Sequence, residues 1–208
     1  MDSTLVAVRW EPTAGLIIQI APLVVLAAVV CGVALFLLRG RILRRFHIVS
    51  VSFPLPGGST VEVRPNEDDL QIAHRIWTEL VTRKAALPLD PEHDIIVEVY
   101  DSWYALFGRI RELIADIPAR LVRDEKSTRE LVHIATSTLN DGLRPHLTEW
   151  QARYRNWYAN QTEQLKTRTP QQVQREYPDY ARLVGDMTKV NRQLIAYAEA
   201  LKRAVDGQ

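Results

Sequence analysis

The most prominent pattern along the chain is an apolar run from Leu16 to Leu38, LIIQIAPLVVLAAVVCGVALFLL, in which no residue is charged. As an α-helix that rises about 1.5 Å per residue, this run would extend about 34 Å. A bilayer has a hydrocarbon core of about 30 Å, so one crossing fits with slight tilt. The pattern predicts a single transmembrane helix over residues 16–38, which argues against a freely soluble enzyme.

The charges on either side of this run predict its orientation. Residues 1–15 contain Arg9 as their one basic residue, whereas four arginines follow the run: Arg39, Arg41, Arg44 and Arg45. Because basic residues gather on the cytoplasmic side of a span, we expect residues 1–15 outside the cytoplasm and the long C-terminal part inside it. A cleaved signal peptide is the alternative, but it would carry its positive charge before a shorter apolar stretch.

Small and polar residues interrupt the apolar run, notably Gln19, Ala28 and Gly32. In lipid such residues allow helices to approach closely, so we expect them to pack spans together or to line a pore. They can also be ordinary residues of a membrane helix. A single span conducts nothing by itself, so a pore would require several copies of the chain.

A basic juxtamembrane segment, residues 39–65, links the run to the rest of the chain. Within it, the alternating HIVSVSF (47–53) and VEVR (61–64) flank the turn-rich PLPGGS. This arrangement predicts a short β-hairpin. A lone two-stranded hairpin is barely stable in water, so we expect it to pack on helices or to pair between subunits.

Residues 66–208 have the periodicity of helices. Two stripes of apolar residues repeat at alternating steps of three and four: Ile96, Val99, Trp103, Leu106, Ile110, Leu113 and Ile117, then Tyr180, Leu183, Met187, Val190, Leu194, Tyr197 and Leu201. Such stripes are typical of amphipathic helices that pack in a bundle. The fold class expected for the whole chain is mainly α: one transmembrane helix, a β-hairpin and a cytoplasmic antiparallel helical bundle.

Capping residues and prolines predict where these helices begin and end. Asn66 should cap a helix that ends near Ala86, Asp90 a second that begins at Pro91, and Ser127, with Glu130 as a capping box, a third. Two further boundaries come from breakers: a break or kink in the third helix at Gly142 and Pro145, and the start of the last helix after Pro178.

Composition and motifs favour a protein without enzymatic chemistry. Lys and Arg number 26 against 25 Asp and Glu, so the net charge of +1 gives no overall attraction to nucleic acid. One cysteine excludes an internal disulfide framework. Phosphate-binding loops, zinc-protease motifs and hydrolase nucleophile motifs do not occur in the sequence. We therefore predict no enzyme activity, no cofactor and no metal.

Arginines and aromatic residues alternate in residues 142–158, GLRPHLTEWQARYRNWY. Bases stack on aromatic rings and guanidinium groups bind phosphates, so this segment is a candidate single-stranded nucleic-acid site. The candidate ligands are Arg144, His146, Arg153 and Arg155, with Arg109 and Arg111 of the preceding helix. The aromatic residues of the segment also have helical spacing, so they can instead be core.

The segments IWTELVTRKAALPLDPEHDIIVEVYDSWYALF (76–107) and STLNDGLRPHLTEWQARYRNWY (137–158) resemble the transmembrane effectors of the Hailong antiphage defence systems. The resemblance extends over most of residues 47–206. It implies a homotetramer that forms an ion channel in the bacterial inner membrane. It also implies that single-stranded DNA oligomers, made by a partner nucleotidyltransferase, bind the helical domain and hold the channel closed. Loss of those oligomers would depolarise the membrane.

A different function fits the same amphipathic helices. A membrane-anchored scaffold or signalling adaptor would use its helical bundle to dock a protein partner. Such a protein would neither conduct ions nor bind oligonucleotides, which distinguishes it from the channel.

Overall fold

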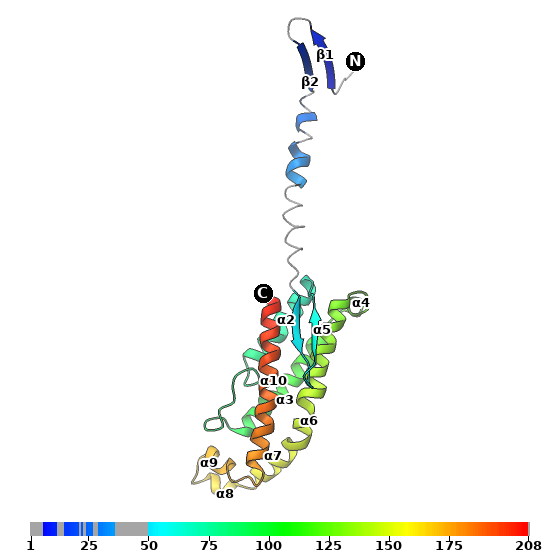
Figure 1. Cartoon of the computed structure of the whole chain (residues 1–208). Coiled ribbons are helices and arrows are strands. Elements are labelled where there is room, and N and C mark those ends of the chain that lie inside the picture. The colour runs from blue at the N-terminus through cyan, green and yellow to red at the C-terminus, as the bar shows by residue number, and fades with distance from the viewer. Residues whose placement is uncertain are drawn as a thin grey trace. The chain divides into compact units, whose positions relative to one another are not determined.

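The computed structural model describes residues 6–11, 15–20, 22, 24–26, 29–35 and 50–207. They belong to two compact units, Met1–His47 and Ile48–Gln208. The second unit is a bundle of helices with one β-hairpin along its side (Figure 1). The chain is thus mainly helical, as the sequence predicts, with small antiparallel sheets.

The first unit contains a hairpin that the sequence analysis did not anticipate. Strand β1 (Val6–Glu11) pairs antiparallel with β2 (Gly15–Ile20), so that Val6 lies opposite Ile20. The predicted helix therefore does not begin at Leu16, because the isoleucine-rich GLIIQI favours an extended strand and has a partner strand to pair with. Gln19 is part of β2.

Helical residues follow β2 at positions 22, 24–26 and 29–35, which include Gly32. Ala28 and the last residues of the predicted span lie outside the described residues. In the part of the chain that the structure describes, none of the helices has both the length and the apolar character needed to cross a bilayer.

The predicted β-hairpin of the second unit is confirmed. Strands β3 (Val51–Pro54) and β4 (Thr60–Val63) pair antiparallel, and the turn between them uses two glycines with positive φ, Gly57 and Gly58. Alternate residues of the strands face the helices, and the centroids of the Phe53 and Tyr197 rings are 6.3 Å apart. The hairpin is therefore stabilised by packing on the bundle.

Helix α2 (Glu67–Val81) begins where the sequence predicts. The Asn66 side chain accepts a hydrogen bond from the backbone N–H of Asp69 at 2.9 Å, and the Asp69 carboxylate accepts one from the N–H of Asn66 at 3.0 Å. This reciprocal pair is a capping box. The helix ends at Val81, earlier than predicted, and an irregular loop of residues 82–95 follows.

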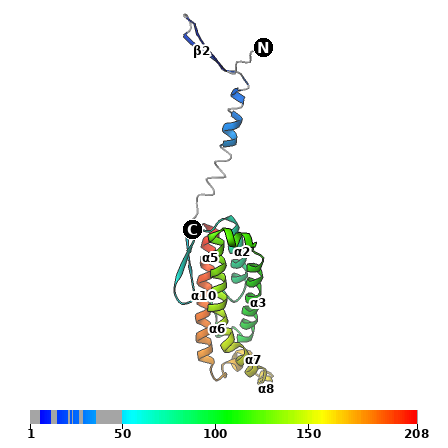
Figure 2. The ribbon, with the colours of Figure 1, turned by 90° about the vertical axis from the view of Figure 1, so that its right-hand side faces the viewer.

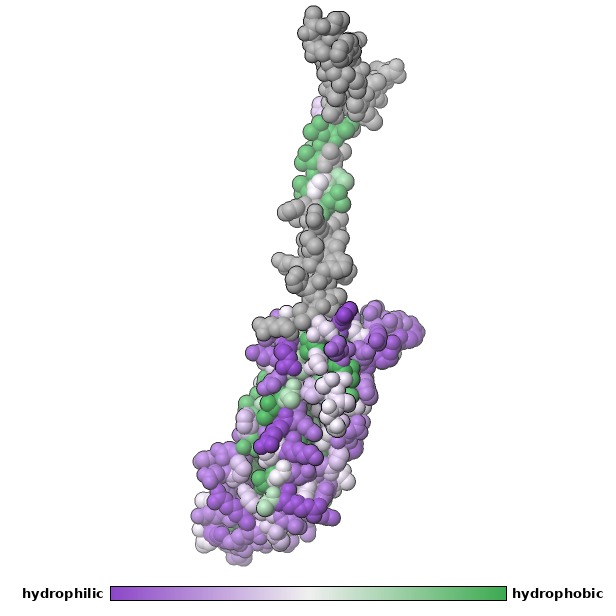
Figure 3. Space-filling view, in the orientation of Figure 1, coloured by the Kyte–Doolittle hydropathy of each residue, from purple (hydrophilic) through white to green (hydrophobic). Residues whose placement is uncertain are grey.

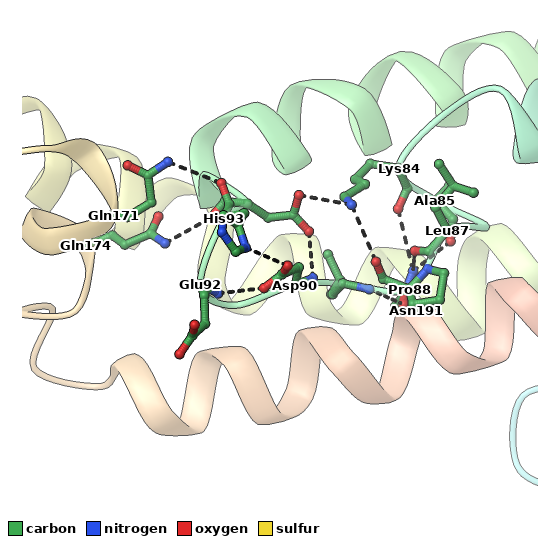
Figure 4. A network of polar contacts seen from close by, with 12 residues as sticks. Lys84, Ala85, Leu87, Pro88, Asp90, Glu92, His93, Gln171, Gln174 and Asn191 are labelled. Carbon is green, nitrogen blue, oxygen red and sulfur yellow. Dashed lines mark hydrogen bonds and ion pairs between the residues drawn. The ribbon is translucent and has the colours of Figure 1, made fainter.

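The second predicted helix boundary is wrong. Helix α3 (Ile96–Ala115) begins at Ile96, and its first N–H donates to the side chain of the buried Gln174 at 3.0 Å. Gln174 also donates to the carbonyl of Asp94 at 2.9 Å, as Figure 4 shows. The predicted cap, Asp90, instead accepts from the N–H of Glu92 within the loop. A side chain distant in sequence thus performs the role that local spacing had given to Asp90.

Asn191 of α10 holds the same loop against the bundle (Figure 4). Its amide nitrogen donates to the carbonyls of Ala85 at 2.8 Å and Leu87 at 3.0 Å, while its oxygen accepts from the N–H of Leu89 at 3.2 Å. Asn191 is buried. These backbone groups therefore depend on one side chain for their hydrogen bonds.

We expect Asn191→Leu to lower the free energy of unfolding by about 2–4 kcal/mol, because it keeps the branched shape of the side chain but leaves buried and half-buried backbone groups without partners. Denaturant unfolding of the full chain in detergent, followed by tryptophan fluorescence, measures this loss. Lys189→Leu, an exposed position on the same helix, is the control. Equal losses in the two variants would contradict the role assigned to Asn191.

Residues 119–159 begin with the short helix α4 (Ala119–Asp124). A nearly continuous helix follows, in which the sequence had predicted a break or kink. Its parts are α5 (Lys126–Ser137), the π-helical η1 (Thr138–Leu143), α6 (Arg144–His146), the π-helical η2 (Leu147–Gln151) and α7 (Ala152–Ala159). The helix is not broken at Gly142 and Pro145, because the π-helical turns on either side of Pro145 continue it. Its regular α-helical pattern is nevertheless interrupted at the residues where the sequence predicted a break or kink.

The predicted capping box at Ser127 and Glu130 does not form. Helix α5 begins at Lys126, and Ser127 instead accepts a hydrogen bond from the Asn66 side chain at 3.4 Å. The carboxylate of Glu130 forms an ion pair with Lys126 at 3.4 Å. A contact with another element again replaces a local cap.

Two short helices, α8 (Thr162–Leu165) and α9 (Pro170–Gln174), lead to the long α10 (Tyr180–Asp206), which begins after Pro178 as predicted. Figure 2 shows α10 beside the helix of α5 and α6, with the hairpin along α10. Both predicted apolar stripes face the interior: all seven residues of the α3 stripe are buried, and of the α10 stripe only Tyr180 remains half-buried. The predicted burial of both stripes inside a bundle of helices is therefore confirmed.

Candidate nucleic-acid interface

The structure separates the six residues predicted to bind single-stranded DNA. His146 is only 2% exposed, and both of its ring nitrogens have partners inside the bundle. Its Nδ1 lies 2.7 Å from Asp186 Oδ2, and its Nε2 lies 3.2 Å from the Tyr100 hydroxyl. His146 therefore presents no nitrogen to a phosphate on the surface, and its prediction as a DNA ligand does not agree with its position.

A buried polar cluster surrounds His146, between the two π-helical segments. Trp150 donates from Nε1 to the same Asp186 oxygen at 3.2 Å, and the Trp103 ring meets the imidazole edge-on at 5.6 Å. Burial raises the pKa of Tyr100, so its hydroxyl keeps its proton and donates to Nε2. The partners then assign the imidazole proton to Nδ1, which donates to Asp186.

Burial also lowers the pKa of His146 from its ordinary value of 6.5, although the hydrogen bond and charge of Asp186 oppose this shift. The imidazole is therefore neutral at pH 7. Because the folded protein binds this proton less readily than the unfolded chain, acidification below about pH 6.5 favours unfolding.

We expect the free energy of unfolding to fall between pH 7 and pH 5, and to fall less in His146→Gln, which has no proton to bind. His93 acts in the opposite sense, since the neighbouring Asp90 raises its pKa. Denaturant unfolding at several pH values measures the slope, and His133→Gln, at an exposed position, is the control. An unchanged slope in His146→Gln would refute the role of His146.

Two of the predicted arginines, Arg109 of α3 and Arg153 of α7, have different surroundings. Arg109 donates to Glu79 at 3.1 Å and to Glu112 at 3.0 Å, so carboxylates already neutralise its charge. Arg153 is exposed on α7, where its charge opposes the rise in the pKa of Tyr177.

The structure brings Arg144 of α6 onto helix α3. Its guanidinium carbon lies 4.7 Å from the centroid of the Phe107 ring, a cation–π contact. Its Nε and Nη2 both donate to the Asn140 side chain, at 3.1 Å and 3.0 Å. The guanidinium plane is thus held in place but keeps donors for another ligand, because five N–H groups are present.

Phe107 belongs to a second stripe on α3, with Tyr104 three residues before it and Arg111 four residues after it. Residues at this spacing are neighbours on a helix surface. Tyr104 is 68% exposed, the largest value among the exposed large apolar and aromatic residues of the described chain. Tyr104, Phe107, Arg111 and Arg144 are here called the Tyr104–Arg144 face.

No carboxylate among residues 50–207 neutralises the positive charges of this face. Among residues 50–207, neither Arg111 nor Arg144 forms an ion pair. Arg155 of α7 differs, because it pairs with Asp101 of α3. The face therefore offers two positive groups beside two aromatic rings, which suits a strand with exposed bases and phosphates.

The sequence analysis missed Tyr104 and Phe107, although a signal was present. Positions 104, 107 and 111 repeat the spacing of the buried 103, 106 and 110, one residue later, and so form their own stripe beside the core. Within residues 142–158, the alternative prediction that the aromatic residues belong to the core is confirmed for Trp150 and Tyr154, which are buried.

Comparison with protein-family models, with curated proteins and with solved structures finds no match to this chain.

Proposed function

We propose that this protein is an oligomeric membrane effector of bacterial antiphage defence whose helical domain binds single-stranded DNA at the Tyr104–Arg144 face. The observation that carries the proposal is the stacking of Arg144 on Phe107, next to the exposed Tyr104 and Arg111. The resemblance to Hailong effectors supports the same ligand and adds the channel.

The apolar surface of the N-terminal unit supports placement in a membrane. The six exposed large side chains of its described helical residues are each between 51% and 61% exposed: Val25, Leu26, Val29, Val30, Val33 and Leu35. In Figure 3 they belong to the green atoms that lie among the grey ones. Large apolar side chains this exposed are unfavourable in water, so we expect lipid or other copies of the chain to cover them. We place this segment in the inner membrane, with the N-terminus outside.

Several copies, as in a homotetramer, would surround a pore, which one span cannot form. A DNA oligomer from a partner nucleotidyltransferase would favour the closed arrangement by binding it more tightly than the open one. Loss of the oligomer during infection would remove that preference, open the channel and depolarise the membrane. The proposed role requires no catalysis by this chain.

Oligonucleotide binding to the full chain in bilayer discs tests the DNA site. We expect Tyr104→Ala to weaken the binding of a fluorescent single-stranded oligothymidine by about 5–160-fold, because one stacked base contributes about 1–3 kcal/mol. Tyr104→Phe keeps the ring and should bind like the wild type. Anisotropy titration measures both. A monomeric protein that binds no oligonucleotide would refute the proposal.

The scaffold hypothesis is the second candidate, because tyrosine and arginine also dominate the centres of protein–protein interfaces. It predicts that expression leaves the membrane potential unchanged and that the Tyr104–Arg144 face captures a protein. Membrane-potential dyes in expressing cells separate the two functions, since only the channel depolarises them.

A further inference from the structure

A cavity of about 270 Å³ lies between the β3–β4 turn, the π-helical η1 and α10. Apolar groups form most of its wall, among them Leu55, Pro56, Val190 and Leu194. All of these residues belong to the second unit, and none of them is part of the Tyr104–Arg144 face. The cavity is at the small end of ligand pockets, which suits one short apolar chain.

The missing side chain of Gly142 keeps this space open. A Cβ at Gly142 would approach Pro56 Cγ to 3.3 Å and Gln193 Oε1 to 3.8 Å. The two positive-φ glycines of the turn, Gly57 and Gly58, allow the hairpin to bend over η1 at this point. Glycine residues in η1 and in the β3–β4 turn therefore leave room for the cavity.

Four polar side chains also line the cavity: Thr138, Arg192, Gln193 and Tyr197. Arg192 lines the cavity, is exposed, and among residues 50–207 forms no ion pair. Tyr197 also lines it, and the buried Tyr197 hydroxyl has no hydrogen-bond partner among the described residues. An unpaired cation at the rim of an apolar cavity complements a single anionic group carried on an apolar chain.

The geometry points to a binding site for a monoanionic amphiphile, of the class of medium-chain carboxylic acids. The apolar chain lies between the hairpin turn and α10, and the carboxylate pairs with Arg192. An uncharged apolar molecule would leave Arg192 without a role, and a polyanion would meet only one cation in an apolar wall. This site is independent of the proposed DNA site.

Photolabelling of the full chain in bilayer discs tests the site, with a diazirine-bearing decanoic acid as probe. We expect labelled peptides from residues 51–63 and 182–203, and we expect unlabelled decanoate to displace the probe from them. Labelling confined to residues 16–38, or labelling that decanoate does not displace, overturns the proposal.

Variants then locate the ligand within the cavity. Arg192→Gln should raise the decanoate concentration for half-displacement about tenfold and leave decanol unaffected, whereas Lys189→Gln, the matched charge change on α10, should alter neither. Equal displacement in Arg192→Gln and Lys189→Gln overturns the assignment.

A cavity-filling variant gives a separate readout. Ala196→Trp fills the cavity from its half-exposed rim and should abolish labelling without affecting the fold. Gly185→Ala is the control, since a Cβ there meets nothing within 4 Å. Full labelling of a folded Ala196→Trp variant contradicts the site.

Discussion

Arg111→Glu combined with Arg144→Glu is expected to weaken the binding of single-stranded oligothymidine by at least about 100-fold at low salt. Each substitution removes a charged hydrogen bond to phosphate, of about 1.5–3 kcal/mol, and adds a repulsive charge. The dependence of affinity on salt should also weaken, because two fewer phosphates are neutralised: the slope of log K against log salt becomes about 1.4 less negative. Anisotropy titrations at several salt concentrations measure both effects.

The control for this variant carries the same change in net charge at other exposed positions, Arg153→Glu with Lys189→Glu. If both double variants lose the same affinity, binding depends on overall charge and not on the Tyr104–Arg144 face. Unchanged affinity in the test variant would remove the face from the proposal altogether. Neither Arg111 nor Arg144 is buried, so the fold should tolerate both substitutions.

Leu26→Arg combined with Val30→Arg is expected to move the protein from the membrane fraction to the supernatant, or to prevent its accumulation. Each arginine near the middle of a spanning helix costs about 2.5–3.5 kcal/mol on the insertion scale. The two positions are four residues apart, so on a helix the charges would lie side by side and repel each other. Ultracentrifugation of cell lysates, with a carbonate wash of the membranes, measures the distribution.

Leu26→Met combined with Val30→Met is the matched control, because it changes the same positions and keeps their apolar character. This control should remain in the membrane fraction and, under the channel hypothesis, should still depolarise cells. Recovery of the wild type from the supernatant, or firm membrane insertion of the arginine variant, would contradict the transmembrane segment.

The elements that the sequence predicted correctly depend on near neighbours. The capping box of Asn66 and Asp69 spans three residues, and the turn of β3 and β4 needs only its own glycines. The stripes of α3 and α10 repeat every three or four residues, so their burial follows from helical geometry. These features could be predicted because the residues that stabilise them are close together in the sequence.

The candidate site depended on contacts between elements, and there the sequence was a weaker guide. Arg144 and Arg109 look alike in the sequence, yet one stacks on Phe107 and the other is held by two carboxylates. The π-helical turns around Pro145 change which side chains face inward, so that His146 meets Asp186 inside the bundle. Spacing along an ideal helix does not predict that change.

By itself, the sequence determined that this chain has a long uncharged apolar run, a hairpin and a bundle of amphipathic helices, because periodicity and capping are local properties. Only the tertiary structure decided that Gln174 begins α3, that His146 is buried, and that Tyr104 joins Arg144 on one surface. The reason is physical: which side chains meet across helices is set by how whole elements pack, and packing energy depends on residues far apart in the chain.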